Sequence, residues 1–180
     1  MMASPRMGNV LKDDSVQSNH NEHMTNNEML TANGQCQCGD VQFEVKGKPL
    51  LRGYCHCTIC QEFNKADYAD ITLYRARDVV MPKQGTVQYK AYTSPAMVHR
   101  GKCVSCEQPA IEYLSLPLMP NLVIVPTSNI KSKSDLPDSR LHIFYHSRVK
   151  DIKDSLPKYE GYLKSQLAFF AGLIKGYLAR

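Results

Sequence analysis

The stretch GYCHCTIC, residues 53–60, places Cys55, Cys57 and Cys60 within six positions, with His56 between the first two. Cysteines spaced as C-x-C and C-x-x-C can turn their thiolates toward one ion in a tight turn, and such spacing is typical of zinc sites. A single motif of this kind is a weak signal. The other cysteines of the chain decide whether it organises the fold.

All seven cysteines lie in three compact groups: Cys36 and Cys38; Cys55, Cys57 and Cys60; Cys103 and Cys106. Seven thiols cannot all pair as internal disulfides. A structural zinc prefers four ligands, whereas a catalytic zinc is usually held by three, with one position open. We therefore expect two zinc ions per chain. Iron–sulfur ligation is the metal alternative, and zinc is favoured for separated turn motifs in a small domain.

Spacing alone leaves two partitions of the cysteines open. In the first, the two C-x-x-C pairs form a zinc ribbon, which consists of Cys57, Cys60, Cys103 and Cys106. In the second, which is more economical, the three-cysteine group stays intact and the first pair meets the last pair across the domain. His56 is a less favoured fourth ligand for the three-cysteine group. Neighbours in a tight turn often point away from the metal, so its expected role is packing or a hydrogen bond.

Length and composition favour one intracellular domain. The chain has 180 residues, 43% of them apolar, and a net charge of +5. We find no run of about 20 apolar residues, which a membrane-spanning helix requires. Residues 1–33 lack the apolar core of a signal peptide, so we expect a cytoplasmic protein with reduced thiols. The mild charge gives no reason to expect a nucleic-acid partner.

The hydrophobic pattern divides the chain into three parts. Residues 1–33 are rich in Asn, Ser, His and Met without apolar periodicity, which predicts a disordered extension. Residues 34–160 carry short alternating runs between turn residues, which predicts an all-β domain of short antiparallel sheets. The expected strands are 41–45, 87–91, 110–116, 121–125 and 141–147.

Residues 161–180 predict an amphipathic C-terminal helix. One apolar stripe recurs at three- and four-residue spacing: Leu163, Leu167, Phe170, Ile174 and Leu178. Three more apolar residues widen it: Phe169, Leu173 and Tyr177. We expect this stripe to be buried, either on its own domain or on a twin subunit in a homodimer. Both are favoured over binding at a membrane surface.

Four motifs together resemble one known family: CQCGDVQFEV, GYCHCTIC, GKCVSCEQPAIEY and LHIFYHSRVKDIKDSLPKYEGY. From about Gly34 to Tyr162, the chain resembles the glutathione-dependent formaldehyde-activating enzyme and centromere-protein-V family. The resemblance implies a β-tent fold with two zinc sites. A structural zinc would be held by Cys36, Cys38, Cys103 and Cys106. A reactive zinc would be held by Cys55, Cys57 and Cys60.

The resemblance also implies carbon–sulfur lyase chemistry on a glutathione–aldehyde adduct such as S-hydroxymethylglutathione. Independently of the family, a zinc with three thiolates is suited to take a substrate thiol as its fourth soft ligand. Since this adds negative charge, nearby cations should help, and Arg52 and Lys65 are the nearest in sequence. A non-catalytic zinc-stabilised binding module, a chromatin or protein adaptor, is the alternative. A chaperone-like or dimerising protein is a third class.

Two departures from the family pattern concern the turns. Glu107 stands where the family usually has glycine after the last motif cysteine, and residues 61–70 lack the usual glycine-containing loop. Substrate contacts are therefore expected to differ from those of the founding enzyme. Tyr54 and Phe63 are expected to form a wall beside the three-cysteine group. The histidines expected on strands have packing as their simplest explanation, and they are His99, His142 and His146.

Overall fold

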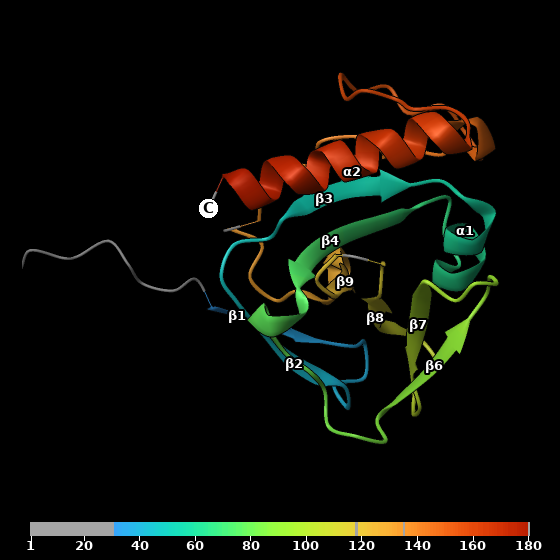
Figure 1. The fold of residues 1–180 in the computed structure, drawn as a ribbon. Coiled ribbons are helices and arrows are strands. Elements are labelled where there is room, and N and C mark those ends of the chain that lie inside the picture. Colours follow the sequence, from blue (N-terminus) through green and yellow to red (C-terminus); the bar gives the residue numbers. More distant parts are fainter. Residues whose placement is uncertain (1–30, 118, 135, 180) are drawn as a thin grey trace, which may run out of the picture.

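The computed structural model describes residues 31–179 except 118 and 135, and the fold is mostly β (Figure 1). The strands are β1 (Thr31–Gln35), β2 (Gln42–Lys46), β3 (Leu51–Cys55), β4 (Ala69–Arg75), β5 (Val79–Val80), β6 (Val87–Ala91), β7 (Val98–Cys103), β8 (Pro109–Leu114), β9 (Leu122–Pro126) and β10 (His142–Ile143). The helices are α1 (Thr58–Asn64) and α2 (Tyr162–Leu178), with short 3₁₀ turns η1 (Ala76–Asp78), η2 (Thr127–Asn129) and η3 (Tyr145–Ser147).

The strands form two sheets, one of three strands in the order β1-β2-β5 and one of seven in the order β10-β3-β4-β9-β8-β7-β6. Most neighbours are antiparallel, as predicted. The pair β10–β3 is parallel, so the expectation of purely antiparallel sheets is wrong there. Strand β10, which is far from β3 in sequence, pairs with β3 and brings His142 beside Tyr54. That register places the later part of the chain next to the three-cysteine group.

The predicted strands agree with the structure in four of five places: 41–45, 87–91, 110–116 and 121–125 correspond to β2, β6, β8 and β9. The fifth, 141–147, is wrong beyond β10. Phe144 adopts a left-handed conformation (φ 54°), which ends the strand, and η3 follows. Strand β1 begins at Thr31, ahead of the boundary predicted at residue 34. The rest of the predicted disordered extension lies outside the described residues.

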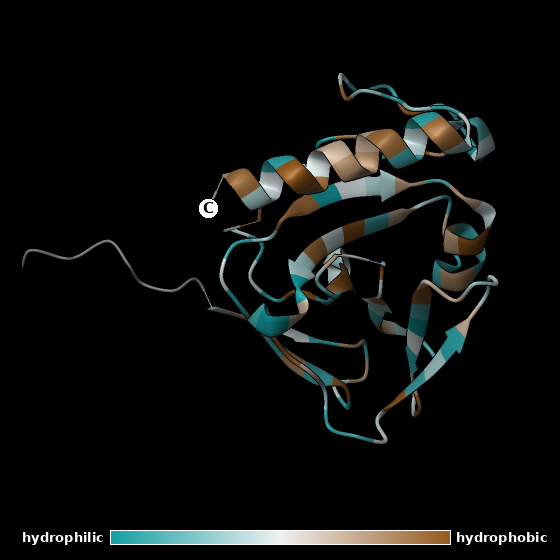
Figure 2. Cartoon of the chain, in the orientation of Figure 1, coloured by the Kyte–Doolittle hydropathy of each residue, from teal (hydrophilic) through white to brown (hydrophobic). Residues whose placement is uncertain are grey.

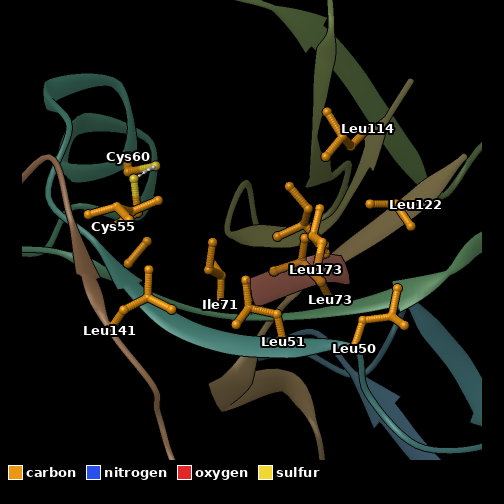
Figure 3. Close-up of a cluster of buried hydrophobic side chains, with 13 residues drawn as sticks. Leu50, Leu51, Cys55, Cys60, Ile71, Leu73, Leu114, Leu122, Leu141 and Leu173 are labelled. Carbon is orange, nitrogen blue, oxygen red and sulfur yellow. Dashed lines mark hydrogen bonds between the residues drawn. The ribbon is translucent and has the colours of Figure 1, made fainter. Parts of the chain in front are cut away.

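Two apolar clusters make up the core. The first lies under β2 and packs Val41, Phe43 and Val45, as their alternation predicted. The second lies between β3, β4 and α2, and it includes Leu51, Leu73 and Leu173. Figure 3 shows this second cluster, with Cys55 and Cys60 at one end of it. The three-cysteine group is therefore built into the edge of a packed core.

Helix α1, with seven residues, departs from the all-β prediction for the middle of the chain. A helix this short has too few turns to show an apolar period. Contacts at its two ends stabilise this helix instead. The Cys57 sulfur accepts a hydrogen bond from the Cys60 amide at the N-cap, and Lys65 ends the helix in a left-handed conformation (φ 50°). The side chain of Phe63, a residue of this helix, is buried.

Helix α2 forms where predicted and packs along β3 and β10. It docks through Phe170 and the three residues that widen the predicted stripe, and not through the rest of that stripe. Four of the five residues of the predicted buried stripe are exposed: Leu163 (69%), Leu167 (62%), Ile174 (56%) and Leu178 (80%). The buried residues of α2 are Ser165, Leu173 and Gly176. Phe169, Phe170 and Tyr177 pack partly against the core. No helix in the described ranges is long and apolar enough to cross a membrane.

Small residues explain which face of α2 docks. A Cβ atom at Gly176 would lie 2.0 Å from the Leu50 carbonyl oxygen, so only glycine lets the helix backbone come this close. Ser165 adds hydrogen bonds at the same face, because its Oγ accepts from the Phe144 amide (2.8 Å) and donates to the Tyr159 carbonyl (3.1 Å). The most apolar stripe is therefore not the stripe that fits the domain.

We expect Gly176→Ala to lower the melting temperature. The new methyl group meets backbone that cannot rotate away, so overpacking should cost about 1–3 kcal/mol and outweigh the gain in helix propensity. Gly172→Ala is the matched control, because its Cβ would meet only the flexible end of Leu51, at 3.0 Å. Differential scanning calorimetry of both variants measures the effect. Equal melting temperatures would show that α2 does not dock in this way.

Candidate metal centres

The seven cysteines gather in two clusters, which are Cys36, Cys38, Cys103 and Cys106, and Cys55, Cys57 and Cys60. Within each cluster all sulfur atoms lie within 4.8 Å of one another, and all seven are free thiols. The structure thus brings together the four and the three of the more economical partition. The zinc-ribbon alternative is wrong, because Cys57 and Cys60 do not join Cys103 and Cys106.

The four-cysteine cluster joins two distant turns. Cys36 and Cys38 lie in the turn between β1 and β2, whereas Cys103 ends β7 and Cys106 lies in the turn that leads to β8. The Cys38 sulfur lies 3.4 Å from that of Cys36 and 3.6 Å from that of Cys103. A disulfide needs about 2.05 Å, whereas four sulfurs around one zinc at about 2.3 Å are about 3.8 Å apart. These distances suit a shared ion.

Glu107 closes the second of these turns. Its φ is 56°, in the left-handed region that glycine favours, and its amide donates to the Cys103 carbonyl at 2.9 Å. The glutamate therefore takes the backbone conformation for which the family usually uses glycine. With glutamate at this position, the turn still places Cys103 and Cys106 in one cluster with Cys36 and Cys38.

The three-cysteine cluster spans the junction of β3 and α1. Cys55 ends β3, Cys57 is the N-cap of α1 and Cys60 lies in the first turn of the helix. The Cys55 sulfur lies 3.5 Å from that of Cys57 and 3.2 Å from that of Cys60. Cys55 and Cys60 are buried, whereas Cys57 is half-buried. The cluster is therefore reached from the side of Cys57.

The cluster favours one thiolate in particular. Hydrogen bonds from Cys55 and then from Cys60 lower the pKa of Cys57 to about 3. The same contact with Cys57 raises the pKa of Cys55 well above its ordinary value. Cys57, the least buried of the three residues, is therefore the thiol that ionises most readily. Three sulfurs with this spacing and one open side suit an ion that has a vacant fourth position.

Arg100 supplies the cation at this cluster. Its Nη2 atom lies 3.4 Å from the Cys60 sulfur, and its Nη1 atom lies 2.5 Å from Glu112 Oε2. The glutamate side chain is fully buried, and burial raises its pKa to about 7. Arg100 and Glu112 face each other across β7 and β8, and the guanidinium lies 5.4 Å from the centre of the Phe63 ring. The ion pair is thus fixed by the sheet.

The two cations nearest in sequence have other roles, and Lys65 is an exposed surface charge, as expected. Arg52 makes a two-pronged ion pair with Asp70, in which Nη2 and Oδ2 are 2.8 Å apart, and Lys65 caps α1. Arg100 is 40 residues beyond Cys60, so the separation along the chain hid it. The available signal was weak. Glu112 lies in the predicted strand 110–116, where a buried charge needs a partner.

His56 turns away from the cysteines and starts a chain of hydrogen bonds. Its Nε2 atom lies 2.9 Å from His142 Nδ1, and His142 Nε2 lies 2.8 Å from Asp154 Oδ2. Lys158 donates to the other oxygen of Asp154 at 2.5 Å. Burial, and next the neighbouring His142, lower the pKa of His56 to about 4, so the ring is neutral. This series of hydrogen bonds links the segment between Cys55 and Cys57 to the Asp-Ser-Leu-Pro motif, which begins with Asp154.

Two aromatic residues predicted as a wall differ in their roles. Phe63 packs under Arg100 and Lys102, beside the three-cysteine cluster. Tyr54 instead packs against His142 and Tyr68, at 4.8 and 5.1 Å between ring centres. The remaining predicted histidines divide between a strand and a turn. His99 lies on β7, and His146 lies in η3, where its Nδ1 accepts from the Gly161 amide.

The fold is mostly β and carries one four-cysteine and one half-open three-cysteine cluster, each of which could hold a metal ion. Residues 31–147 match the family model of the glutathione-dependent formaldehyde-activating enzyme, and the chain belongs to this family. A crystal structure of a Rhodobacter sphaeroides protein is similar at 18% identity and a TM-score of 0.44, over 59% of this chain and 96% of that one. The search of curated proteins found no match.

Proposed function

We propose that this protein is a zinc-dependent enzyme of the carbon–sulfur lyase type that acts on a glutathione–formaldehyde adduct. Family membership supports the substrates. The observation that carries the proposal is the three-cysteine cluster, which has one accessible sulfur and a buried arginine beside it. We place the enzyme in the cytoplasm, where glutathione is kept reduced.

Both cysteine clusters fit zinc in this proposal, with two ions per chain. The four-cysteine cluster would hold a structural ion, and Cys55, Cys57 and Cys60 would hold a reactive one. A zinc with three thiolates supplies an open position that takes a soft ligand such as a thiol. The protein's own residues then have two tasks, which are to offset the charge and to hold the cysteines in place.

Arg100 offsets charge at the cluster. Three thiolates around a divalent ion leave one negative charge, and a substrate thiolate adds another. The guanidinium is always protonated and lies at Cys60, in a site where it is largely shielded from water. Glu112 holds this cation in place. Because Arg100 offsets part of the negative charge of the thiolates, the cluster can accept another anion.

His56 and His142 hold the segment that carries Cys55 and Cys57. The His56 amide donates to the Ile143 carbonyl at 3.0 Å, and its ring bonds to His142. Gln61 reinforces the same segment, because its Nε2 donates to the carbonyls of His56 and Ser147. The cysteines are thus fixed by contacts that do not use their sulfur atoms.

The reaction that we assign is the addition of the glutathione thiol to formaldehyde and its reverse. In the forward direction the sulfur–carbon bond forms at the carbonyl carbon. The carbonyl π bond breaks, and the thiol proton ends on the new hydroxyl oxygen. In the reverse direction the same carbon–sulfur bond is cleaved and formaldehyde is released.

Exchange spectroscopy by NMR on glutathione and ¹³C-formaldehyde tests this function. We expect the zinc-loaded protein to accelerate the interconversion above the spontaneous rate, and Cys57→Ser to abolish the acceleration. Val104→Ala is a matched control, because this exposed side chain lies beside the other cluster. No acceleration by folded, zinc-loaded protein would contradict the enzyme. Glutathione binding without turnover would instead favour the binding module.

A further inference from the structure

The outward face of α2 is an apolar strip that the domain does not cover. Leu163, Leu167, Ile174 and Leu178 are each more than half exposed, and they lie on the side opposite the buried Gly176. In Figure 2, hydrophobic residues recur along the length of this helix. Isolated apolar side chains on a surface are ordinary, whereas a row of four on one helix face marks an interaction site.

Charge decides between the partners that could cover this strip. Helix α2 contains Lys164 and Lys175 and no carboxylate. At 3.6 residues per turn, both lysines fall on the same flank of the strip. The α2 helix of a second copy would bring the same two lysines and no carboxylate of its own to balance them. In an antiparallel pair of helices, Lys164 of one would approach Lys175 of the other.

We propose that this face binds the surface of an anionic lipid bilayer. The helix would lie in the plane of the membrane, with the four aliphatic side chains among the acyl chains. Helices with one apolar face and lysines at its border are typical of this mode of binding. The two lysines would extend their ammonium groups to the lipid phosphates, which attract basic residues near the surface.

The docked face of α2 stays in place in this arrangement. Leu173 and Gly176 keep their contacts with the domain, and both cysteine clusters lie outside α2. Membrane binding is therefore independent of the proposed catalytic function. It would bring the enzyme to a surface without changing its fold.

Co-sedimentation of the full-length protein with lipid vesicles tests the proposal. We expect binding to phosphatidylcholine vesicles that contain phosphatidylserine, and binding at least about tenfold weaker to phosphatidylcholine alone. Leu167→Gln/Ile174→Gln should weaken binding to the anionic vesicles by at least about tenfold. Lys164→Gln/Lys175→Gln should reduce the preference for anionic lipid. Val80→Gln, at an exposed apolar residue on β5, is the matched control and should bind as the wild type does.

Two results would overturn the proposal. One is the absence of binding to anionic vesicles by folded protein. The other is a dimer in light scattering that Leu167→Gln/Ile174→Gln converts to monomer, which would assign the face to a second copy of the chain. The altered side chains are exposed, so both variants should keep the wild-type melting temperature. The melting temperature therefore distinguishes a variant that has lost the binding surface from one that has lost its fold.

Discussion

Cys103→Ser is expected to unfold the domain, whereas Cys57→Ser is expected to leave it folded. Cys103 is buried in the first core cluster and joins the end of β7 to the turn between β1 and β2. A structural zinc contributes about 10–16 kcal/mol of apparent binding energy, and the free energy of unfolding of a domain is about 5–15 kcal/mol. Loss of one of four ligands should therefore exceed what the apolar core alone can support.

Circular dichroism and metal analysis of both variants measure this difference. Cys57→Ser should retain one zinc and a cooperative thermal transition, because the altered cluster lies at the edge of the second core. Chelation of the wild type should reproduce the Cys103→Ser spectrum. If both variants unfold equally, or if neither does, the division into a structural and a reactive cluster is wrong.

Replacing the buried ion pair by a neutral pair is expected to remove most of the activity. Arg100→Gln alone would leave Glu112 buried without its partner, which costs about 3–5 kcal/mol and confuses folding with catalysis. The double variant Arg100→Gln/Glu112→Gln avoids this. It also removes the cation that lies 3.4 Å from Cys60. We expect kcat/KM to fall about 10²-fold, since a preorganised charge in a shielded site has an effect of this size.

Glu112→Gln alone is the control for the double variant. The side-chain oxygen of the glutamine can still accept from Arg100 and hold it at the cluster, so most activity should remain if the charge of Arg100 is what matters. Thermal unfolding of the double variant should stay close to that of the wild type, because no unpaired buried charge is left. Full activity in the double variant would show that the cluster works without this cation.

The sequence revealed the strands whose two faces differ in environment. Val41, Phe43 and Val45 alternate with polar residues because only one face of β2 is buried, and this pattern is local. Strand β10 lies within the predicted run 141–147, but the pattern gave no signal for where the strand ends. Its short length follows from the turn at Phe144, and its parallel pairing with β3 is a long-range contact.

The residues of the candidate site also divide into those that local sequence patterns predict and those that depend on contacts between distant segments. The cysteines were visible because ligands in one turn must lie close in sequence. Arg100 and Glu112 were not, because their meeting with Cys60 depends on the arrangement of the strands. The link from His56 through His142 to Asp154 was hidden for the same reason, since it joins three separate segments.

The C-terminal helix shows a limit of hydrophobic periodicity. The most regular apolar stripe of α2 lies on the exposed face, whereas the face that packs on the domain was selected by its shape. Gly176 permits contact with the Leu50 backbone, and a glycine adds nothing to an apolar stripe. A pattern based on hydrophobicity alone therefore gives the presence of the helix and its length but not its orientation.

The absorption spectrum of the cobalt-substituted protein, titrated with glutathione, tests the central proposal most directly. With Cys55, Cys57 and Cys60 as ligands and one position open, glutathione should change the visible bands. S-methylglutathione should change them far less, because it has no thiol to ionise. An unchanged spectrum after glutathione addition, with cobalt shown to occupy both clusters, would contradict a thiol-binding site at the three-cysteine cluster.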